Sequence, residues 1–114
     1  MMNRKFEIDF LEEAIEFIES LDDKARTKIL YNARKSQLVN DPELFKKLSE
    51  DIWEFRTLYN KLQYRLLSFW DKTGNKDTLV IATHGFIKKT KKTPKIELER
   101  AKEIRKSYFE QKKK

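Results

Sequence analysis

Two arginines in neighbouring aromatic-rich segments are the residues of this chain best suited to bind a phosphate group. Arg56 and Arg65 lie in segments 52–59 and 64–70, whose aromatic and branched residues favour strands. The few residues between the segments allow a hairpin, so both arginines could project from one side of a sheet. Guanidinium groups bind phosphate in a bidentate manner. Alternatively, Glu54 pairs with one arginine across the strands, which contributes at most about 1 kcal/mol.

A run of lysines supplies the excess positive charge. Residues 1–87 carry 14 Lys/Arg and 15 Asp/Glu, whereas residues 88–114 carry 12 and 4, so the last quarter accounts for the net charge of +7. Clustered cations attract polyphosphates in a salt-dependent way that is largely independent of sequence. A solvated basic tail and an acidic protein partner are the alternatives. The lysines that open this region are Lys88, Lys89, Lys91, Lys92 and Lys95.

A single histidine lies just past the β-branched run 78–83. His84 could transfer a proton, or it could be a structural hydrogen-bonding residue. Phe86, two residues later, could belong to the core or stack against a nucleic-acid base. With one histidine and no cysteine, nothing in the chain supplies a spaced set of metal ligands. We therefore expect neither a metal ion nor a cofactor.

The first half of the chain is predicted to form one strand and two helices. Residues 5–10 alternate apolar and charged side chains, which is typical of a half-buried strand. Asp9 and Glu12 have the spacing of a capping box that opens the first helix. Asp22 or Asp23 can cap the second. The two helices are predicted to form an antiparallel pair joined by a tight turn.

The second half is predicted to form three strands and a final helix. The strands are the two arginine-bearing segments and the run 78–83, and Thr93-Pro94 is predicted to start the helix, with Thr93 as its N-cap. The order β-α-α-β-β-β-α predicts an α+β fold with a small, mainly antiparallel sheet. We expect a single domain, 1–114, with a basic helix and tail at 93–114. No apolar run reaches the length of a membrane span, so we expect a soluble cytoplasmic protein.

Four segments carry a resemblance to a known family: Trp53-Glu54-Phe55-Arg56-Thr57-Leu58, Tyr64-Arg65-Leu66-Leu67, His84-Gly85-Phe86-Ile87-Lys88-Lys89-Thr90 and Lys92-Thr93-Pro94. The chain resembles the phage-derived, HigB-like branch of the RelE/ParE toxin superfamily over about residues 44–108, and residues 86–94 match its Phe-x-Lys-Lys-Thr-x-Lys-Thr-Pro pattern. The resemblance implies a RelE-like fold and the toxin of a type II toxin–antitoxin system. Such a toxin is a metal-independent endoribonuclease that cuts mRNA, typically on the ribosome, and inhibits growth. Its implied partners are mRNA, the ribosome and a helix-turn-helix antitoxin, with operator DNA bound only through the antitoxin and no membrane.

The implied chemistry assigns roles to the cations. The RNA 2′-OH attacks the adjacent phosphorus, and the extra negative charge must be stabilised by protein donors, each worth about 10²–10³-fold. Arg56 and Arg65 are the leading candidates, with Lys88 and Lys89 completing the catalytic set. The proton acceptor is His84, Glu54 or a lysine with a lowered pKa. Residues expected to bind the flanking RNA are Lys91, Lys92, Lys95 and Phe86.

Two alternatives stay open at this stage. One is a non-enzymatic, ParE-like inhibitor that blocks gyrase by occupying it. The other is an inactive toxin relative that acts as a binding or regulatory module. Cationic binding needs no catalysis, so composition alone does not separate these from a nuclease.

Overall fold

The computed structural model describes residues 4–74 and 78–113. Its elements follow the predicted α+β order, with one further short strand after the second helix. In chain order they are β1 (Glu7–Phe10), α1 (Glu12–Glu19), α2 (Asp23–Leu38), β2 (Phe45–Lys47), β3 (Trp53–Tyr59), β4 (Leu62–Asp71), β5 (Leu79–Lys88) and α3 (Lys95–Lys112). No helix of these described ranges is both long and apolar enough to cross a lipid bilayer.

The strands form one five-stranded sheet in the order β1-β5-β4-β3-β2. Strands β2 to β5 pair antiparallel, whereas β1 pairs parallel with β5. The predicted sheet of mainly antiparallel strands is confirmed. Only strands joined by a tight hairpin must be antiparallel, so the pattern of the first strand did not reveal its parallel pairing with the last.

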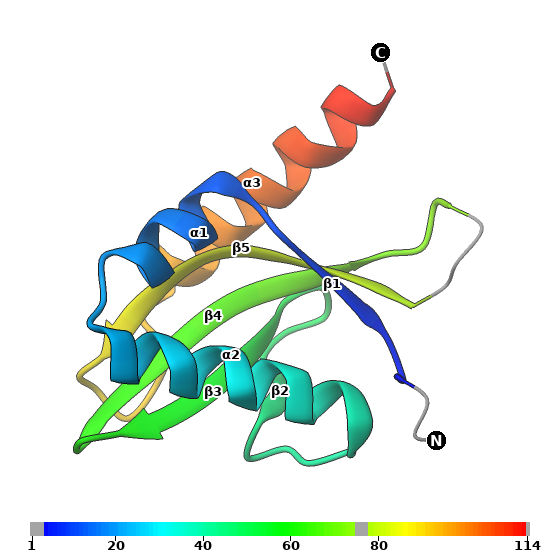
Figure 1. Cartoon of the computed structure of the whole chain (residues 1–114). Coiled ribbons are helices and arrows are strands. Elements are labelled where there is room, and N and C mark those ends of the chain that lie inside the picture. Colours follow the sequence, from blue (N-terminus) through cyan, green and yellow to red (C-terminus); the bar gives the residue numbers. More distant parts are fainter. Residues whose placement is uncertain (1–3, 75–77, 114) are drawn as a thin grey trace.

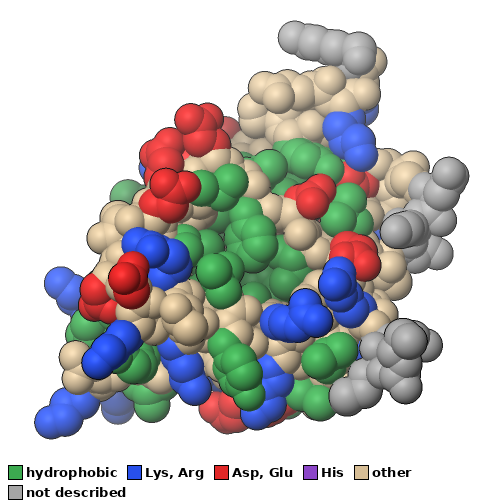
Figure 2. Space-filling model, in the orientation of Figure 1, with side chains coloured by type: hydrophobic (Ala, Val, Ile, Leu, Met, Phe, Trp, Pro, Cys, Tyr) green, Lys and Arg blue, Asp and Glu red, His purple; other side chains and the backbone are tan. Residues whose placement is uncertain are grey.

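The helices cover opposite faces of the sheet. Figure 1 shows α1 and α2 on one face and α3 on the other. Figure 2 views the α1–α2 face, where hydrophobic side chains reach the surface between the two helices. One core cluster lies beneath α1 and α2 and includes Phe6, Ile18, Ile29 and Phe55. The other lies beneath α3 and includes Ile52, Leu67, Phe69, Phe86 and Ala101.

Of the N-caps predicted for the first two helices, one is present. The Asp22 carboxylate accepts a hydrogen bond from the Ala25 amide at 2.9 Å, which confirms it as the cap of α2. The capping box predicted from Asp9 and Glu12 is wrong, because α1 follows Leu11 and has no side-chain cap. Asp9 pairs with Ile81 within the sheet, and this extended backbone holds its carboxylate away from the helix.

The start of α3 also differs from the prediction. Pro94 is the N-cap, without a side-chain hydrogen bond, and the helix begins at Lys95. The hydroxyl of Thr93 instead donates to Glu54 Oε1, 3.3 Å away. A tertiary contact has therefore replaced the local cap, and it attaches the lysine-rich segment to β3.

The turn between β3 and β4 sets the register of the site. Asn60 and Lys61 have φ values of 51° and 65° and join strands that pair from Tyr59 and Leu62 onward. Two residues with positive φ are typical of a type I′ hairpin turn, whose twist matches that of the strands. Counting back from this turn places Arg56 directly opposite Arg65.

Strand β5 is longer than the predicted run 78–83 and ends at Lys88. His84 and Phe86 therefore lie inside the strand rather than past it. Gly85 between them faces α1, where an added Cβ would collide with the Phe17 ring. Because side chains alternate along a strand, His84 and Phe86 point to the opposite face, beneath α3.

Candidate functional site

The register brings most of the predicted site residues onto one face of the sheet. Arg56 pairs with Arg65, and Arg65 pairs with Phe86 on the next strand. Directly opposite residues share a face, and Lys88 and His84 lie two positions either side of Phe86. The prediction that Arg56 and Arg65 project from the same side is confirmed.

Glu54 lies between the two arginines and contacts both. Its Oε2 is 3.6 Å from Arg56 Nε and its Oε1 is 3.4 Å from Arg65 Nε. Thr93 also donates to Oε1. The alternative predicted a pairing of Glu54 with one arginine, whereas in the structure the carboxylate contacts both. Glu54 holds the two guanidinium groups close together despite their like charge.

The two arginines differ in exposure. The Arg65 side chain is 3% exposed, and burial lowers its pKa. It donates to the Tyr64 carbonyl at 3.1 Å and to Gln63 Oε1 at 2.8 Å. The Arg56 side chain is 24% exposed and donates to the Pro42 carbonyl at 3.4 Å. Arg56 is therefore the arginine that a ligand can reach, and Arg65 lies behind it.

A cationic groove begins at Arg56 and continues along the lysine run. It has a volume of about 630 Å³, and none of the described residues that line it is acidic. Five of them carry positive charge: Arg56, Lys61, Lys88, Lys89 and Lys91. A concave surface of one charge sign concentrates counter-ions and polyanions, so the groove suits a phosphodiester backbone.

Lys88 is the half-buried lysine of this groove. Partial burial lowers its pKa, and the nearby positive charges of Arg65 and Arg56 lower it further. Glu54 opposes this effect only in part. A lysine with a lowered pKa holds a larger fraction of neutral amine near neutral pH, so it can accept a proton.

His84 lies on the same face but outside the groove. It is 5% exposed, with Nε2 3.1 Å from Glu97 Oε1 on α3 and Nδ1 3.0 Å from Thr83 Oγ1. Burial lowers its pKa, although Glu97 opposes the shift. Its contacts join β5 to the first turn of α3. The catalytic role of His84 stays a prediction, and its position favours holding the helix.

The remaining predicted RNA-binding residues are divided between surface and core. Phe86 is 9% exposed and packs beneath α3, with its ring centroid 6.2 Å from that of His84. Its ring is therefore part of the core cluster. Lys92 and Lys95 are exposed beyond the groove, and Lys95 lies 4.0 Å from Glu99.

Two cations of this face were missed by sequence reasoning. Lys61 lines the groove from the hairpin turn. Lys46 lies on β2, opposite Glu54. Asn60 favours a two-residue hairpin turn, and this turn would have placed Lys61 beside the groove. A three-residue strand has too short a pattern to predict, so no comparable signal existed for Lys46.

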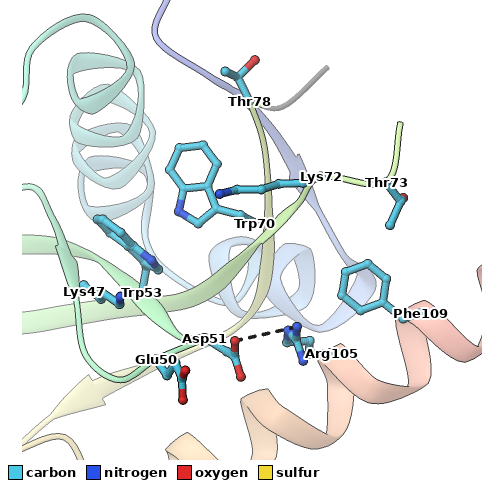
Figure 3. Close-up of a pocket in the computed structure, with 10 residues that line it drawn as sticks. All are labelled: Lys47, Glu50, Asp51, Trp53, Trp70, Lys72, Thr73, Thr78, Arg105 and Phe109. Carbon is cyan, nitrogen blue, oxygen red and sulfur yellow. Dashed lines mark ion pairs between the residues drawn. The ribbon is translucent and has the colours of Figure 1, made fainter. Parts of the chain in front are cut away.

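A second cavity, of about 730 Å³, lies at the end of β3 and β4 that is away from the hairpin turn and the groove. Figure 3 shows Trp53 and Trp70 on one side and Arg105 and Phe109 of α3 on the other. Its charges are mixed, because Glu50 and Asp51 also line it and Asp51 lies 3.8 Å from Arg105. It contains none of the predicted site residues and lacks the uniform positive charge of the groove.

Over residues 4–74 and 78–113, no three or more histidine, aspartate or glutamate side chains gather where they could hold a metal ion. The positive charge near Arg56 is supplied by side chains. The arginine and lysine side chains that line the groove are of the kind that binds phosphate.

Residues 16–106 match the model of one protein family, described as "Phage derived protein Gp49-like (DUF891)". No curated protein matches the chain. The family match covers most of the chain and includes both arginines, His84 and the lysine run from Lys88 to Lys95. By this match, and with the fold and groove described above, the chain belongs to the phage-derived Gp49-like family.

Proposed function

We propose that this protein is the toxin of a type II toxin–antitoxin system, a metal-independent endoribonuclease of the HigB-like branch of the RelE/ParE superfamily. It cuts mRNA on translating ribosomes and so inhibits growth. The observation that carries the proposal is the pairing of Arg56 with Arg65 at the head of a groove lined by lysines and no described acidic residue. Membership of the Gp49-like family and the α+β fold support it.

Arg56 binds the scissile phosphate in this proposal. It is the exposed arginine of the pair and lines the groove. As the 2′-oxygen bonds to phosphorus and the bond to the 5′-oxygen breaks, negative charge grows on the phosphate oxygens. A preorganised donor at that position accelerates the step by about 10²–10³-fold. Arg65 acts from behind, since it is buried, by adding positive potential and by holding Glu54.

Lys88 accepts the proton of the 2′-OH. Its pKa is lowered by burial and by the arginines, and it lines the same groove as Arg56. The 5′-oxygen takes up a proton from water, which the open groove admits. Lys89 and Lys91 bind the flanking phosphates, and Lys92 and Lys95 extend the positive field along the same RNA strand.

The proposed partners follow from this role. A cognate helix-turn-helix antitoxin neutralises the protein and is the component that contacts operator DNA. An antitoxin segment that carries carboxylates and covers Arg56 would compete directly with RNA, because both would bind the same cations.

The test is expression of the protein alone in a bacterial host. We expect growth arrest together with new mRNA 5′ ends inside coding regions, and we expect Arg56→Ala to abolish both. Lys47→Ala is the matched control, because Lys47 is exposed on the opposite face of the sheet. Arrest with intact mRNA and induced DNA-damage signalling would favour the gyrase inhibitor instead. Unaffected growth would favour the binding module.

A further inference from the structure

The cationic face extends past the groove to the edge strand of the sheet. Strand β2 is the outermost strand, and Lys46 at its centre lies opposite Glu54 of β3. Glu54 lies on the face of Arg56, so Lys46 shares that face. Lys47, the next residue, lies opposite Trp53 and faces the other side.

The positions of these cations define a diagonal across the sheet. From β5 to β2 it runs from Lys88, opposite Gln63, past the Arg65–Arg56 pair to Lys46. Its ends are three strand spacings apart, about 14 Å, and are also offset along β3 by the four residues from Leu58 to Glu54, about 13 Å, so they lie about 19 Å from each other. A single phosphate group does not span that distance, so the two lysines can contact only different phosphates of one strand.

Lys46 is available for such a contact. It is exposed, and among the described residues it has no carboxylate partner within 4.0 Å. Its charge also acts on the site, since Lys46 is one of the cations that lower the pKa of Lys88. The field of Lys46 therefore reaches the groove.

We propose that Lys46 binds a second backbone phosphate of the RNA, so that the strand leaves the groove over Arg56 and crosses to the edge strand β2. This inference rests on the proposed function and deepens it by giving the path of the substrate. Cations placed in succession along a polyanion each release condensed counter-ions, and the binding becomes more dependent on salt. Lys46 is thus a positioning residue, distant from the reacting atoms.

The experiment measures binding of a 2′-O-methyl RNA decanucleotide, which lacks the attacking hydroxyl, over a salt series. The slope of log K against log salt changes by about 0.7 for each phosphate contact in a single strand. We expect Lys46→Ala to reduce the slope by about that amount and Lys47→Ala to leave it unchanged. Equal effects of the two substitutions, or none from Lys46→Ala, would overturn the proposal.

A shorter probe tests whether the effect of Lys46→Ala on binding requires a second phosphate. A 2′-O-methyl dinucleotide has one phosphodiester, so Lys46→Ala should bind it as the unaltered protein does, whereas Arg56→Ala should bind it more weakly. If Lys46→Ala weakened binding of the dinucleotide as much as binding of the decanucleotide, the proposed path of the RNA would be wrong. If the unaltered protein binds neither probe, the proposed function fails. If the unaltered protein binds the decanucleotide and Lys46→Ala has no effect on that binding, the path is rejected but the proposed function is not.

Discussion

Two buried carboxylates on the face of the sheet beneath α3, Glu54 on β3 and Asp71 at the end of β4, are satisfied in different ways. Asp71 is 1% exposed and accepts from Tyr108 at 2.6 Å, from Lys112 at 2.7 Å and from the Thr73 hydroxyl and amide at 2.6 and 2.9 Å. Glu54 is 2% exposed, but its contacts with Arg56, Arg65 and Thr93 range from 3.3 to 3.6 Å.

The difference separates a structural contact from a candidate site. Short hydrogen bonds hold the pKa of Asp71 well below its ordinary value and attach the end of α3 to β4. At Glu54, the Nε atoms of both arginines are buried without a hydrogen-bond partner among the described residues. Unmet donors are costly in a core, and in native structures such groups are few and call for an explanation, such as a catalytic role. Asp71 is thus expected to control stability, and the Glu54 region to control activity.

The largest expected effect is on activity, in the site around Glu54. Lys88→Met should slow RNA cleavage by about 10²–10⁴-fold, the range for losing a general base. The neutral amine is the active form, so the cleavage rate of the unaltered protein should rise with pH through a pKa below the ordinary 10.5 of lysine. Single-turnover rates across pH check both statements. A full rate or an unchanged pH profile in Lys88→Met would remove Lys88 from this role.

The next effect is on stability, at Asp71. Asp71→Ala should lower the free energy of unfolding by about 3 kcal/mol, because charged hydrogen bonds are lost while Lys112 can still reach water. The folded pKa of Asp71 is depressed, so its contribution is present above the unfolded pKa and is lost as the pH falls below it. Urea titration measures the change. Cleavage by the folded protein should persist, and its loss would show that Asp71 is coupled to the site around Glu54.

A smaller effect isolates one of the Asp71 hydrogen bonds. Tyr108→Phe keeps the ring packed against Phe69, 5.2 Å between centroids, and removes only the hydroxyl. We expect a loss of about 1.5 kcal/mol, the lower value for a hydrogen bond to a charged group. Thermal unfolding at neutral pH provides the measurement. An unchanged midpoint would mean that Lys112 and Thr73 satisfy Asp71 without the tyrosine.

The smallest effect concerns the pH dependence of stability through His84. Burial lowers its folded pKa, so the unfolded state binds more protons between that value and about 6.5. Stability should therefore be fully present above about pH 6.5 and should decrease as the pH falls below it. His84→Gln should flatten this part of the curve in urea titrations. If the decrease in stability persists in the variant, titratable groups other than His84 cause it.

Local sequence patterns were sufficient for most of the elements. Alternation in β3 and β4 and the short hairpin between them were enough to predict that Arg56 and Arg65 share a face, because the period of a strand is two. The cap at Asp22 was predicted for a similar reason, since its partner is three residues away. Predictions failed where a distant partner decided the outcome. Thr93 caps no helix because Glu54 takes its hydroxyl, and Asp9 caps none because β5 holds it in the sheet.

By itself, the sequence determined the α+β class, the concentration of positive charge after residue 87 and the chemistry of the side chains, because each depends on residue type and near-neighbour spacing. Only the tertiary structure decided which cations meet. It buried His84 and Phe86 beneath α3, exposed Arg56 in front of Arg65 and brought Lys46 onto the same face from an edge strand. Long-range strand pairing and helix packing determine solvent access, and neither is encoded in the spacing of one segment.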